Sequence, residues 1–411
     1  MAKLLIFCIL ASRSFFMWFA HMLRTLGGGA MRGKQWIPKL VAAALIAAYL
    51  LFMPEYLDEA LKTRTYDEKF SPEEEPYTGI ITVWHVVGFK PHSGSLGTAL
   101  ASIAKGVERK HYGVFFDVVA MDEAEYAERI ARGETPDLIS FPLGLCYPEQ
   151  LSALDAIPVE GLSEARRSVG TWEGTAYAFP YAMSAHVLLV NTGLFQERGA
   201  ALPEGKKRDA AWISEAAQTF LAAQASGKRK QLPALSGNAV YAAALGLTGE
   251  VAEYDVFKAG NAAMAVADLR AASELQTLQT AGKGFAFEAS ILPDGTSLVQ
   301  MIGLANGISE EKRPYALALI ECLFSESAWK QLSQRGLIAM TGKPEEAGFE
   351  NTLVAAAAES MGDALIPNAF LLQRYHDVLE ETARRALTGD EEAQKDLAAR
   401  LKELVSGMQI K

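Results

Sequence analysis

The chain has 411 residues, of which 50% are hydrophobic and 21% are charged. This composition excludes a disordered chain, and the length predicts two domains or one large α/β unit. The formal net charge is −10 at pH 7. Such a charge argues against a nucleic-acid partner, because nonspecific binding of that kind depends on Lys and Arg neutralising phosphates. The three cysteines, Cys8, Cys146 and Cys322, are too few for a disulfide framework.

The N-terminal region has the pattern of an export signal or a membrane anchor. Leu40–Met53 is uninterrupted apolar sequence, with basic residues before it and acidic residues after it. This charge bias is typical of a segment whose C-terminal side is exported. The length fits a signal-peptide core, but no small-residue cleavage site follows it. We therefore expect residues 1–55 to attach an extracytoplasmic body to the cell membrane, and residues 56–78 to form an acidic stalk.

Two interpretations of the first 30 residues stay open. Leu4–Leu23 is a second apolar stretch, interrupted by Arg13 and His21, and would be a second membrane segment. Alternatively, Met31 is the true start, because Met31 followed by basic residues is a suitable beginning for a signal peptide.

Strand and helix patterns alternate from Gly79 onward. Ile80–Val87 is β-branched and apolar on both faces, which is typical of a strand buried in a parallel sheet. The next expected elements are a helix over 99–107, a strand over 114–120, a helix capped by Asp122 and a strand over 137–141. This order predicts right-handed crossovers and a doubly wound sheet, with a ligand crevice beyond the carboxyl ends of the strands. That crevice would be lined by the loops that begin at Gly88 and Pro142.

The rest of the body continues with mixed patterns. The expected elements are extended sequence over 176–191, a helix over 210–225, a strand over 262–267, extended sequence over 285–293, and long helices over 311–333 and 377–406. We expect the chain to cross between two lobes near Tyr181–Val190 and again near Phe285–Pro293.

Catalytic and metal-binding patterns are absent from the sequence. Ser93–Gly97 lacks the glycine that precedes the serine of a nucleophile elbow, and there is no phosphate-binding glycine loop. His85 and His92 have no Cys or carboxylate at metal-ligand spacing. We expect no enzymatic activity, no cofactor and no metal.

Several segments carry motifs in a characteristic order. They are the strand–helix–strand run 80–141, Gly170–Tyr181, Val187–Phe195, Ala211–Glu215, Phe257–Met264 and Leu304–Trp329. In this order they resemble the extracellular solute-binding proteins of ABC importers, in particular the sugar-binding family that includes maltose-binding protein. The resemblance covers roughly residues 80–345. It implies a two-lobed, periplasmic-binding-protein-like fold, with the ligand held between the lobes.

The resemblance also implies an organisation and a function. Lobe 1 would be 79–185 with 295–342 returning to it, and lobe 2 would be 186–294 with 343–411 packing on it. The protein would capture a small polar ligand, such as a carbohydrate, and deliver it to the permease subunits of an ABC transporter. One alternative is a membrane-anchored ligand sensor or adaptor with the same fold, and a less favoured one is a surface hydrolase.

A sugar site needs aromatic faces and planar polar groups between two closing lobes. The candidate ligand-binding residues are His85, Phe89, Lys90, His92, Phe141, Tyr181, Asn238, Tyr241, Asp268 and Arg270. Arg270 stands where sugar binders often carry a stacking aromatic ring. Together with Lys90 it predicts a modified or acidic saccharide, or another small anion, rather than a long neutral glucan.

Overall fold

The computed structural model describes most of the chain from Tyr77 onward. The described residues are 77–154, 159, 161–205, 208–225, 230–244, 246–292, 296–341, 349, 351–361 and 365–406. They belong to one compact unit, Tyr77–Lys411, which contains two mixed sheets and two apolar cores, so this unit can fold without the residues before it. The predicted export segment and all of the predicted stalk before Tyr77 lie outside the described residues. No helix in the described ranges has the length and apolarity of a membrane span.

The first sheet combines strands from both ends of the described chain. Its strands are β1 (Gly79–Val86), β2 (Val114–Met121), β3 (Leu138–Pro142), β4 (Leu151–Ser152), β7 (Ala178–Met183), β13 (Val299–Ala305) and β14 (Ile338–Ala339). The order is β14-β7-β13-β3-β1-β2, and β4 pairs with β13. β1 runs parallel to β2 and β3, as predicted, whereas β13 runs antiparallel to β3 and β7. The sheet is therefore doubly wound only in its parallel part, because β13 enters it from the second sheet.

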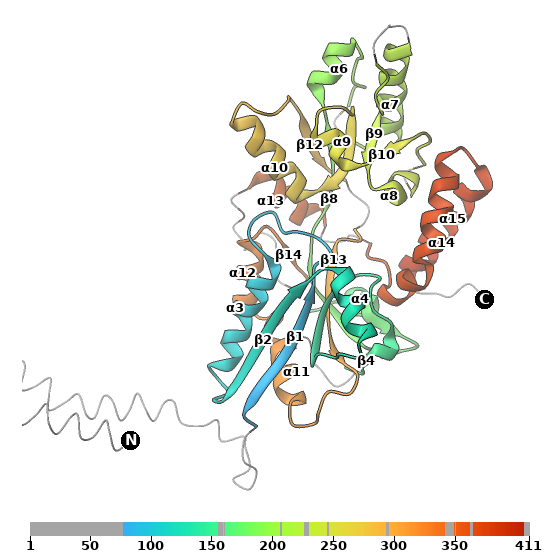
Figure 1. Ribbon diagram of the computed structural model, residues 1–411. Helices are drawn as coiled ribbons and strands as arrows, with labels where there is room; N and C mark the ends of the chain where they lie inside the picture. Colours follow the sequence, from blue (N-terminus) through green and yellow to red (C-terminus); the bar gives the residue numbers. More distant parts are fainter. Residues whose placement is uncertain are drawn as a thin grey trace, which may run out of the picture. The chain divides into compact units, whose positions relative to one another are not determined.

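Helices cover both faces of the parallel part of this sheet (Figure 1). They include α3 (Leu96–Glu108) and α4 (Glu123–Ala131). Gly97 of α3 lies over His85, since a Cβ on Gly97 would be 3.1 Å from the imidazole Cδ2. Tyr126 of α4 meets the Trp84 ring edge-on at 6.2 Å on the opposite face. Asp122 caps α4, as predicted, by accepting a hydrogen bond from the Glu125 amide at 2.8 Å.

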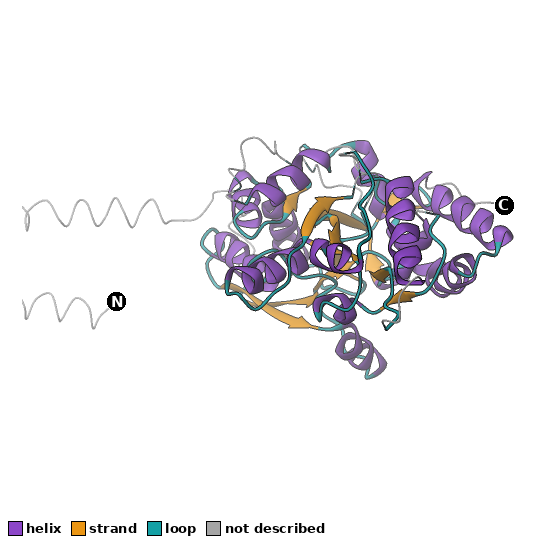
Figure 2. Cartoon of the chain, turned by 90° about the horizontal axis from the view of Figure 1, so that it is seen from above, coloured by secondary structure: helices purple, strands orange, loops and turns teal. Residues whose placement is uncertain are grey.

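The second sheet is built from the middle of the chain. Its strands are β8 (His186–Val190), β9 (Leu235–Gly237), β10 (Val251–Ala252), β11 (Met264–Asp268) and β12 (Glu288–Ile291), in the order β10-β9-β11-β8-β12. Its helices are α6 (Thr192–Arg198), α7 (Ala210–Ala225), α8 (Ala239–Ala244), α9 (Tyr254–Lys258) and α10 (Leu269–Thr280). A small hairpin, β5 (Thr171–Trp172) with β6 (Thr175–Ala176), precedes β7. The helices flank the strands when the molecule is viewed from above (Figure 2).

The chain passes between the two sheets twice. The first passage is Ser184-Ala185, between β7 and β8, and the second lies between β12 and β13. The first passage falls inside the stretch predicted for a crossover, and the second follows the other predicted stretch. The Ser184 carbonyl accepts a hydrogen bond from the Thr296 hydroxyl at 2.9 Å, so the two passages run side by side.

The helix predicted over 311–333 is two helices, α11 (Arg313–Leu323) and α12 (Glu326–Ser333). The Ser325 hydroxyl accepts a hydrogen bond from the Ala328 amide at 3.3 Å, which makes Ser325 the N-cap of α12. A capping serine in the middle of an apolar helical pattern therefore starts a new helix.

The helix predicted over 377–406 is also two helices, α14 (Ala369–Leu387) and α15 (Glu391–Ser406). Gly389 adopts a φ of 89°, which favours glycine, in the turn between them. The Asp390 carboxylate accepts a hydrogen bond from the Ala393 amide at 3.0 Å at the start of α15. The helix before them, α13 (Thr352–Ser360), belongs to the core that contains the first sheet.

Side-chain alternation along the second sheet divides the apolar core. Val187 and Leu189 of β8 belong to the cluster that contains the first sheet, whereas Leu188 and Val190 belong to a second cluster with α7, α8 and the α14–α15 pair. Successive residues of a strand point to opposite faces, so this strand is buried on both sides. The alternation explains why 186–190 is apolar without a break.

Candidate functional site

The carboxyl ends of β1 and β3 lie at the edge of the first sheet where the chain passes to the second sheet (Figure 1). His85 is paired in register with Ser140 at this edge, and Gln300 at the start of β13 is paired with Pro142. Parallel strands end together at one edge, and ligand sites of α/β sheets form there. Polar side chains at this edge are therefore the first candidates for a site.

A buried polar cluster, made of His85, Ser140, Tyr181 and Gln300, occupies this edge. The Ser140 Oγ lies 3.0 Å from His85 Nδ1, 2.9 Å from the Tyr181 hydroxyl and 3.1 Å from Gln300 Nε2. Gln300 Nε2 also donates to the Val86 carbonyl at 2.9 Å, while its Oε1 is buried without a partner. All four side chains are buried, so the cluster is a costly feature unless its hydrogen bonds are satisfied.

Burial sets the protonation of this cluster. It lowers the pKa of His85 to about 4, because desolvation disfavours the imidazolium. Burial also raises the pKa of the Tyr181 hydroxyl far above its usual range, against the smaller opposite effect of the hydrogen bond with Ser140. At neutral pH the cluster is therefore uncharged, and its hydrogen bonds connect neutral groups.

The loop after β1 carries three of the predicted site residues. Phe89 is buried, Lys90 is exposed and His92 is half-buried, with its Nδ1 shielded and without a partner. A Cβ on Gly88 would lie 2.1 Å from the Pro142 Cβ, so only glycine allows the loop to pack against the end of β3. The loop is thus fixed at the edge of the polar cluster.

The second sheet presents polar and aromatic side chains near the same passage. The His186 and Tyr241 rings lie with centroids 4.6 Å apart, and His186 Nε2 is 3.3 Å from the Ser297 hydroxyl. Burial lowers the pKa of His186 to about 4. Asn238 is exposed and caps α8 by accepting from the Tyr241 amide at 2.8 Å.

Asp268 and Arg270 stand at the end of β11 and the start of α10. Asp268 is the N-cap of α10, and its carboxylate accepts from the Ala271 amide at 2.8 Å. Its pKa is raised, mainly by burial. The Arg270 guanidinium donates to Glu274 at 3.0 Å and to the His92 carbonyl at 3.2 Å. Arg270 therefore joins the second sheet's helix to the loop after β1.

The structure brings some predicted site residues together and separates others. Arg270 contacts His92, and Ser140 connects His85 to Tyr181. Phe141 is fully buried in the core. Lys90 forms no hydrogen bond or ion pair with any described residue, so the structure does not pair it with Arg270.

Charge compensation around Arg270 was not part of the sequence prediction. Glu274 accepts from Arg270 and also from Lys258, whose Nζ is 3.1 Å away. These hydrogen bonds, with Arg270 the larger contributor, lower the pKa of the Glu274 carboxyl. The group presented at this point is therefore an ion pair with both donors and acceptors.

Sequence reasoning missed Ser140, Gln300 and His186. Each is a single polar residue within or at the start of an apolar strand. Buried polar side chains need hydrogen-bond partners, so such isolated residues mark a polar site inside a core. That signal was present in the segments DLISF and VQMIGLA.

A separate hollow of about 1020 Å³ lies between α8, the loop before β10 and the C-terminal end of α14. Its lining includes Asn238, Glu250, Glu380 and Arg384. Asn238 is the one predicted site residue in this lining, so the hollow does not coincide with the polar cluster. Among the described residues, no group of His, Cys, Asp and Glu is placed to hold a metal ion.

Solved structures with the same arrangement were found by comparison. The cyclic alpha-maltosyl-1,6-maltose binding protein of Arthrobacter globiformis aligns at a TM-score of 0.58 and 15% identity, over 81% of this chain and 100% of that one. This chain has the fold of sugar-binding ABC solute-binding proteins. The resemblance seen in the sequence is thereby confirmed at the level of the fold.

Two further structures show the same likeness. The GacH receptor of Streptomyces glaucescens, solved unliganded and with acarbose, aligns at a TM-score of 0.56 and 15% identity, over 81% of this chain and 100% of that one. UgpB of Mycobacterium tuberculosis, solved with glycerophosphocholine, aligns at a TM-score of 0.54 and 16% identity, over 80% and 100%. The sequence matches no protein-family model and no curated protein.

Proposed function

We propose that the protein is an extracytoplasmic solute-binding protein that captures a small polar ligand, a carbohydrate in the first instance, between two lobes. Lobe 1 would be 79–185 with 295–342, and lobe 2 would be 186–294 with 343–411. The observation that supports the proposal is that two polar edges meet where the chain passes between the sheets. The edge of the first sheet holds the buried cluster around Ser140. The edge of the second sheet holds His186, Tyr241 and Arg270, and Arg270 contacts the loop after β1 through the His92 carbonyl.

The proposed mechanism is a shift between open and closed arrangements of the lobes. A ligand that contacts both edges binds the closed state better and so increases its population. The hinges would lie at Ser184-Ala185 and at 296–298, the described part of the second passage, because both passages connect the sheets. The closed protein would then deliver the ligand to ABC permease subunits, with residues 1–55 holding it at the cell membrane.

The proposed ligand class follows from the chemistry of the second edge. The Arg270–Glu274 pair offers donors and an acceptor side by side, which suits vicinal hydroxyl groups. The half-buried Tyr241 ring, tilted against the buried His186 imidazole, is the aromatic side chain that this edge offers. Two of the similar structures are named for or contain maltose-type sugars or acarbose, and one contains glycerophosphocholine. An anionic ligand would have to compete with Glu274 for Arg270, so acidic and neutral saccharides must both be tested.

Replacing Arg270 with alanine should weaken ligand binding by about 1.5–3 kcal/mol, or about 10- to 150-fold, because a charged hydrogen bond to the ligand is lost. The measurement is calorimetric titration of Tyr77–Lys411 with maltotriose, acarbose, an acidic oligosaccharide and glycerophosphocholine.

Lys258→Ala is the matched control, since Lys258 also pairs with Glu274 but has no contact with the His92 carbonyl. It should leave the affinity within about twofold, because an exposed ion pair contributes little. Unchanged affinity in Arg270→Ala, or an equal loss in both variants, would remove Arg270 from the site. Failure of every ligand to bind would count against the proposed function itself.

A further inference from the structure

We propose that the end of the first sheet remote from the second sheet is a docking surface for a membrane that carries anionic lipids. We call it the base surface. It consists of the apolar side chains Ile80, Tyr112 and Phe115 and the cationic side chains Lys105, Arg109 and Lys110. The surface chemistry carries this inference independently of the ligand proposed for the protein.

The apolar part of the base surface is unusually exposed. Tyr112 is 92% exposed, Phe115 is 58% exposed and Ile80 is 57% exposed. Ile80 and Phe115 are partners in the parallel register of β1 and β2, so they lie side by side on one face of the sheet. Grouped large apolar side chains on a soluble surface mark a contact with another apolar phase or protein.

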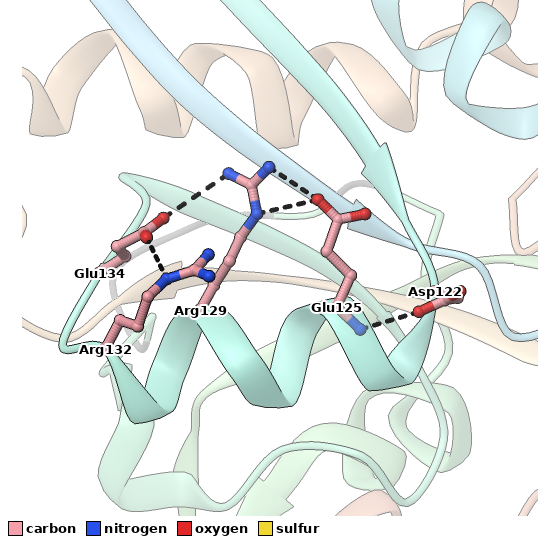
Figure 3. Close-up of polar contacts among 5 residues, drawn as sticks. All are labelled: Asp122, Glu125, Arg129, Arg132 and Glu134. Carbon is pink, nitrogen blue, oxygen red and sulfur yellow. Dashed lines mark hydrogen bonds and ion pairs between the residues drawn. The ribbon is translucent and has the colours of Figure 1, made fainter.

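The neighbouring helix α4 covers the other end of that same face. Trp84, four residues along β1 from Ile80 and on the same face, lies under α4, with the Arg129 guanidinium 5.5 Å from its ring centroid. Arg129 is held there by Glu125 at 2.7 Å and by Glu134 at 3.7 Å (Figure 3). The ion-paired helix shields Trp84, whereas Ile80 and Phe115 at the N-terminal ends of β1 and β2 have no such cover.

The cationic part of the base surface adjoins the apolar part in the chain. Lys105 is in the last turn of α3, and Arg109 and Lys110 lead from it to Tyr112. All three cations are exposed, and none forms an ion pair with a described residue. The nearby Glu108 carboxylate is occupied by the Phe116 amide at 2.9 Å. A helix C-terminus favours cations, but that effect alone does not explain the exposed aromatic residues beside them.

Local charge, rather than net charge, governs contact with a membrane. The chain carries a net charge of −10, but charges more than about 10 Å apart are largely screened at physiological salt. Exposed Tyr, Phe and Ile at the same end of the sheet as Lys and Arg match the polar–apolar interface of a bilayer, where aromatic rings and cations are both favoured. One exposed carboxylate, Asp117, shares the face of Ile80 and Phe115, so the cations of the base surface outnumber it three to one. The base surface therefore fits a lipid surface better than a purely apolar partner.

The entry point of the chain gives the base surface its orientation. Tyr77, the first described residue, packs against Tyr315 at 5.8 Å, and the Gly79 amide donates to the Gly113 carbonyl at 3.0 Å. The chain thus enters the unit next to Tyr112 and Phe115. The base surface therefore lies where the described part of the chain begins.

The test is co-sedimentation of Tyr77–Lys411, which lacks the proposed anchor, with vesicles of phosphatidylcholine alone or mixed with phosphatidylglycerol. We expect binding to the mixed vesicles that declines with added salt.

Arg109→Gln/Lys110→Gln should lower the partition coefficient about 25-fold, because each interfacial cation contributes about fivefold. Phe115→Ser should also lower it. The control Lys395→Gln/Lys402→Gln, on the exposed face of α15, removes the same charge and should change it less than twofold.

Three outcomes would overturn the inference. They are an absence of binding to mixed vesicles, an equal loss in the α15 control, and self-association that Phe115→Ser abolishes in the absence of vesicle binding. The last would assign the surface to a second copy of the chain. Circular dichroism of each variant would show that folding is retained, and ligand titration would show separately whether the proposed function holds.

Discussion

Replacing Ser140 with alanine is expected to lower the free energy of unfolding by about 2–5 kcal/mol. The Ser140 hydroxyl is the common partner of His85, Tyr181 and Gln300, at 2.9–3.1 Å. Its removal takes this partner from the buried Tyr181 hydroxyl and leaves His85 Nδ1 with only the longer contact to Gln300 Nε2 at 3.5 Å. A buried polar group left unsatisfied costs about 1–3 kcal/mol. Gln300 keeps its bond to the Val86 carbonyl and contributes less.

Guanidinium denaturation of Tyr77–Lys411 would measure this loss. Ser152→Ala is the matched control, because Ser152 lies on the same sheet and its hydroxyl makes one bond, to the Ala305 carbonyl at 3.1 Å, at a partly buried position. It should cost about 1 kcal/mol or less. A loss at Ser140 no larger than the loss at Ser152 would show that the cluster does not act as a unit.

Acidification from pH 7.5 to 5 is expected to lower the free energy of unfolding by about 2 kcal/mol for each of His85 and His186, roughly 4 kcal/mol together. Burial lowers the pKa of both residues from 6.5 to about 4 in the folded state. The unfolded chain therefore binds more protons between these values. The stability that each neutral histidine contributes is complete above pH 6.5 and is lost as the pH falls towards about 4.

Denaturation curves at the two pH values, for the wild type and for His85→Gln and His186→Gln, would test this. Each replacement should reduce the pH-dependent loss by about 2 kcal/mol, whatever it does to stability at neutral pH. His376→Gln, at an exposed position on α14, is the control and should leave the loss unchanged. If the two buried replacements leave the pH dependence intact, the histidines are not buried as neutral groups.

Local patterns predicted the parallel part of the first sheet because they depend on near neighbours. The β-branched run at 80–87 and the Asp122 cap are features of single segments, and both elements formed close to the predicted bounds. The insertion of β13 between β3 and β7 depends on contacts between residues more than a hundred positions apart. No local pattern indicates such a pairing.

The breaks in the two long helices were visible in the sequence but outweighed by apolar periodicity. Ser325 and the Gly389-Asp390 pair are ordinary helix-boundary signals, and each interrupts a helix in the structure. Hydrophobic spacing continues across these boundary residues because each of the two consecutive helices buries an apolar face. In 311–333 and 377–406, the boundary residues rather than the hydrophobic periodicity determine where the helices end.

The sequence indicated where candidate residues lie in the fold better than it indicated their hydrogen-bond and ion-pair partners. His85 was predicted from its place in the first strand, and Asp268 and Arg270 from their place after the motif that ends at Met264; the fold places these positions at the edges where the sheets meet. The partners were harder to predict. Glu274 lies one helical turn from Arg270, and that spacing predicts an ion pair that changes the ligand expected there. Ser140 and Gln300 come together only through β13; the resemblance returned 295–342 to lobe 1, but no local pattern paired this strand with β3.

Ligand capture by this fold requires the two polar edges to close on the ligand. Small-angle X-ray scattering of Tyr77–Lys411, with and without a saturating concentration of the ligand that titrates in calorimetry, tests this most directly. Closure about Ser184-Ala185 and the segment before β13 predicts a smaller radius of gyration in the complex. A radius of gyration that does not change while calorimetry shows the site to be filled would contradict capture between two lobes.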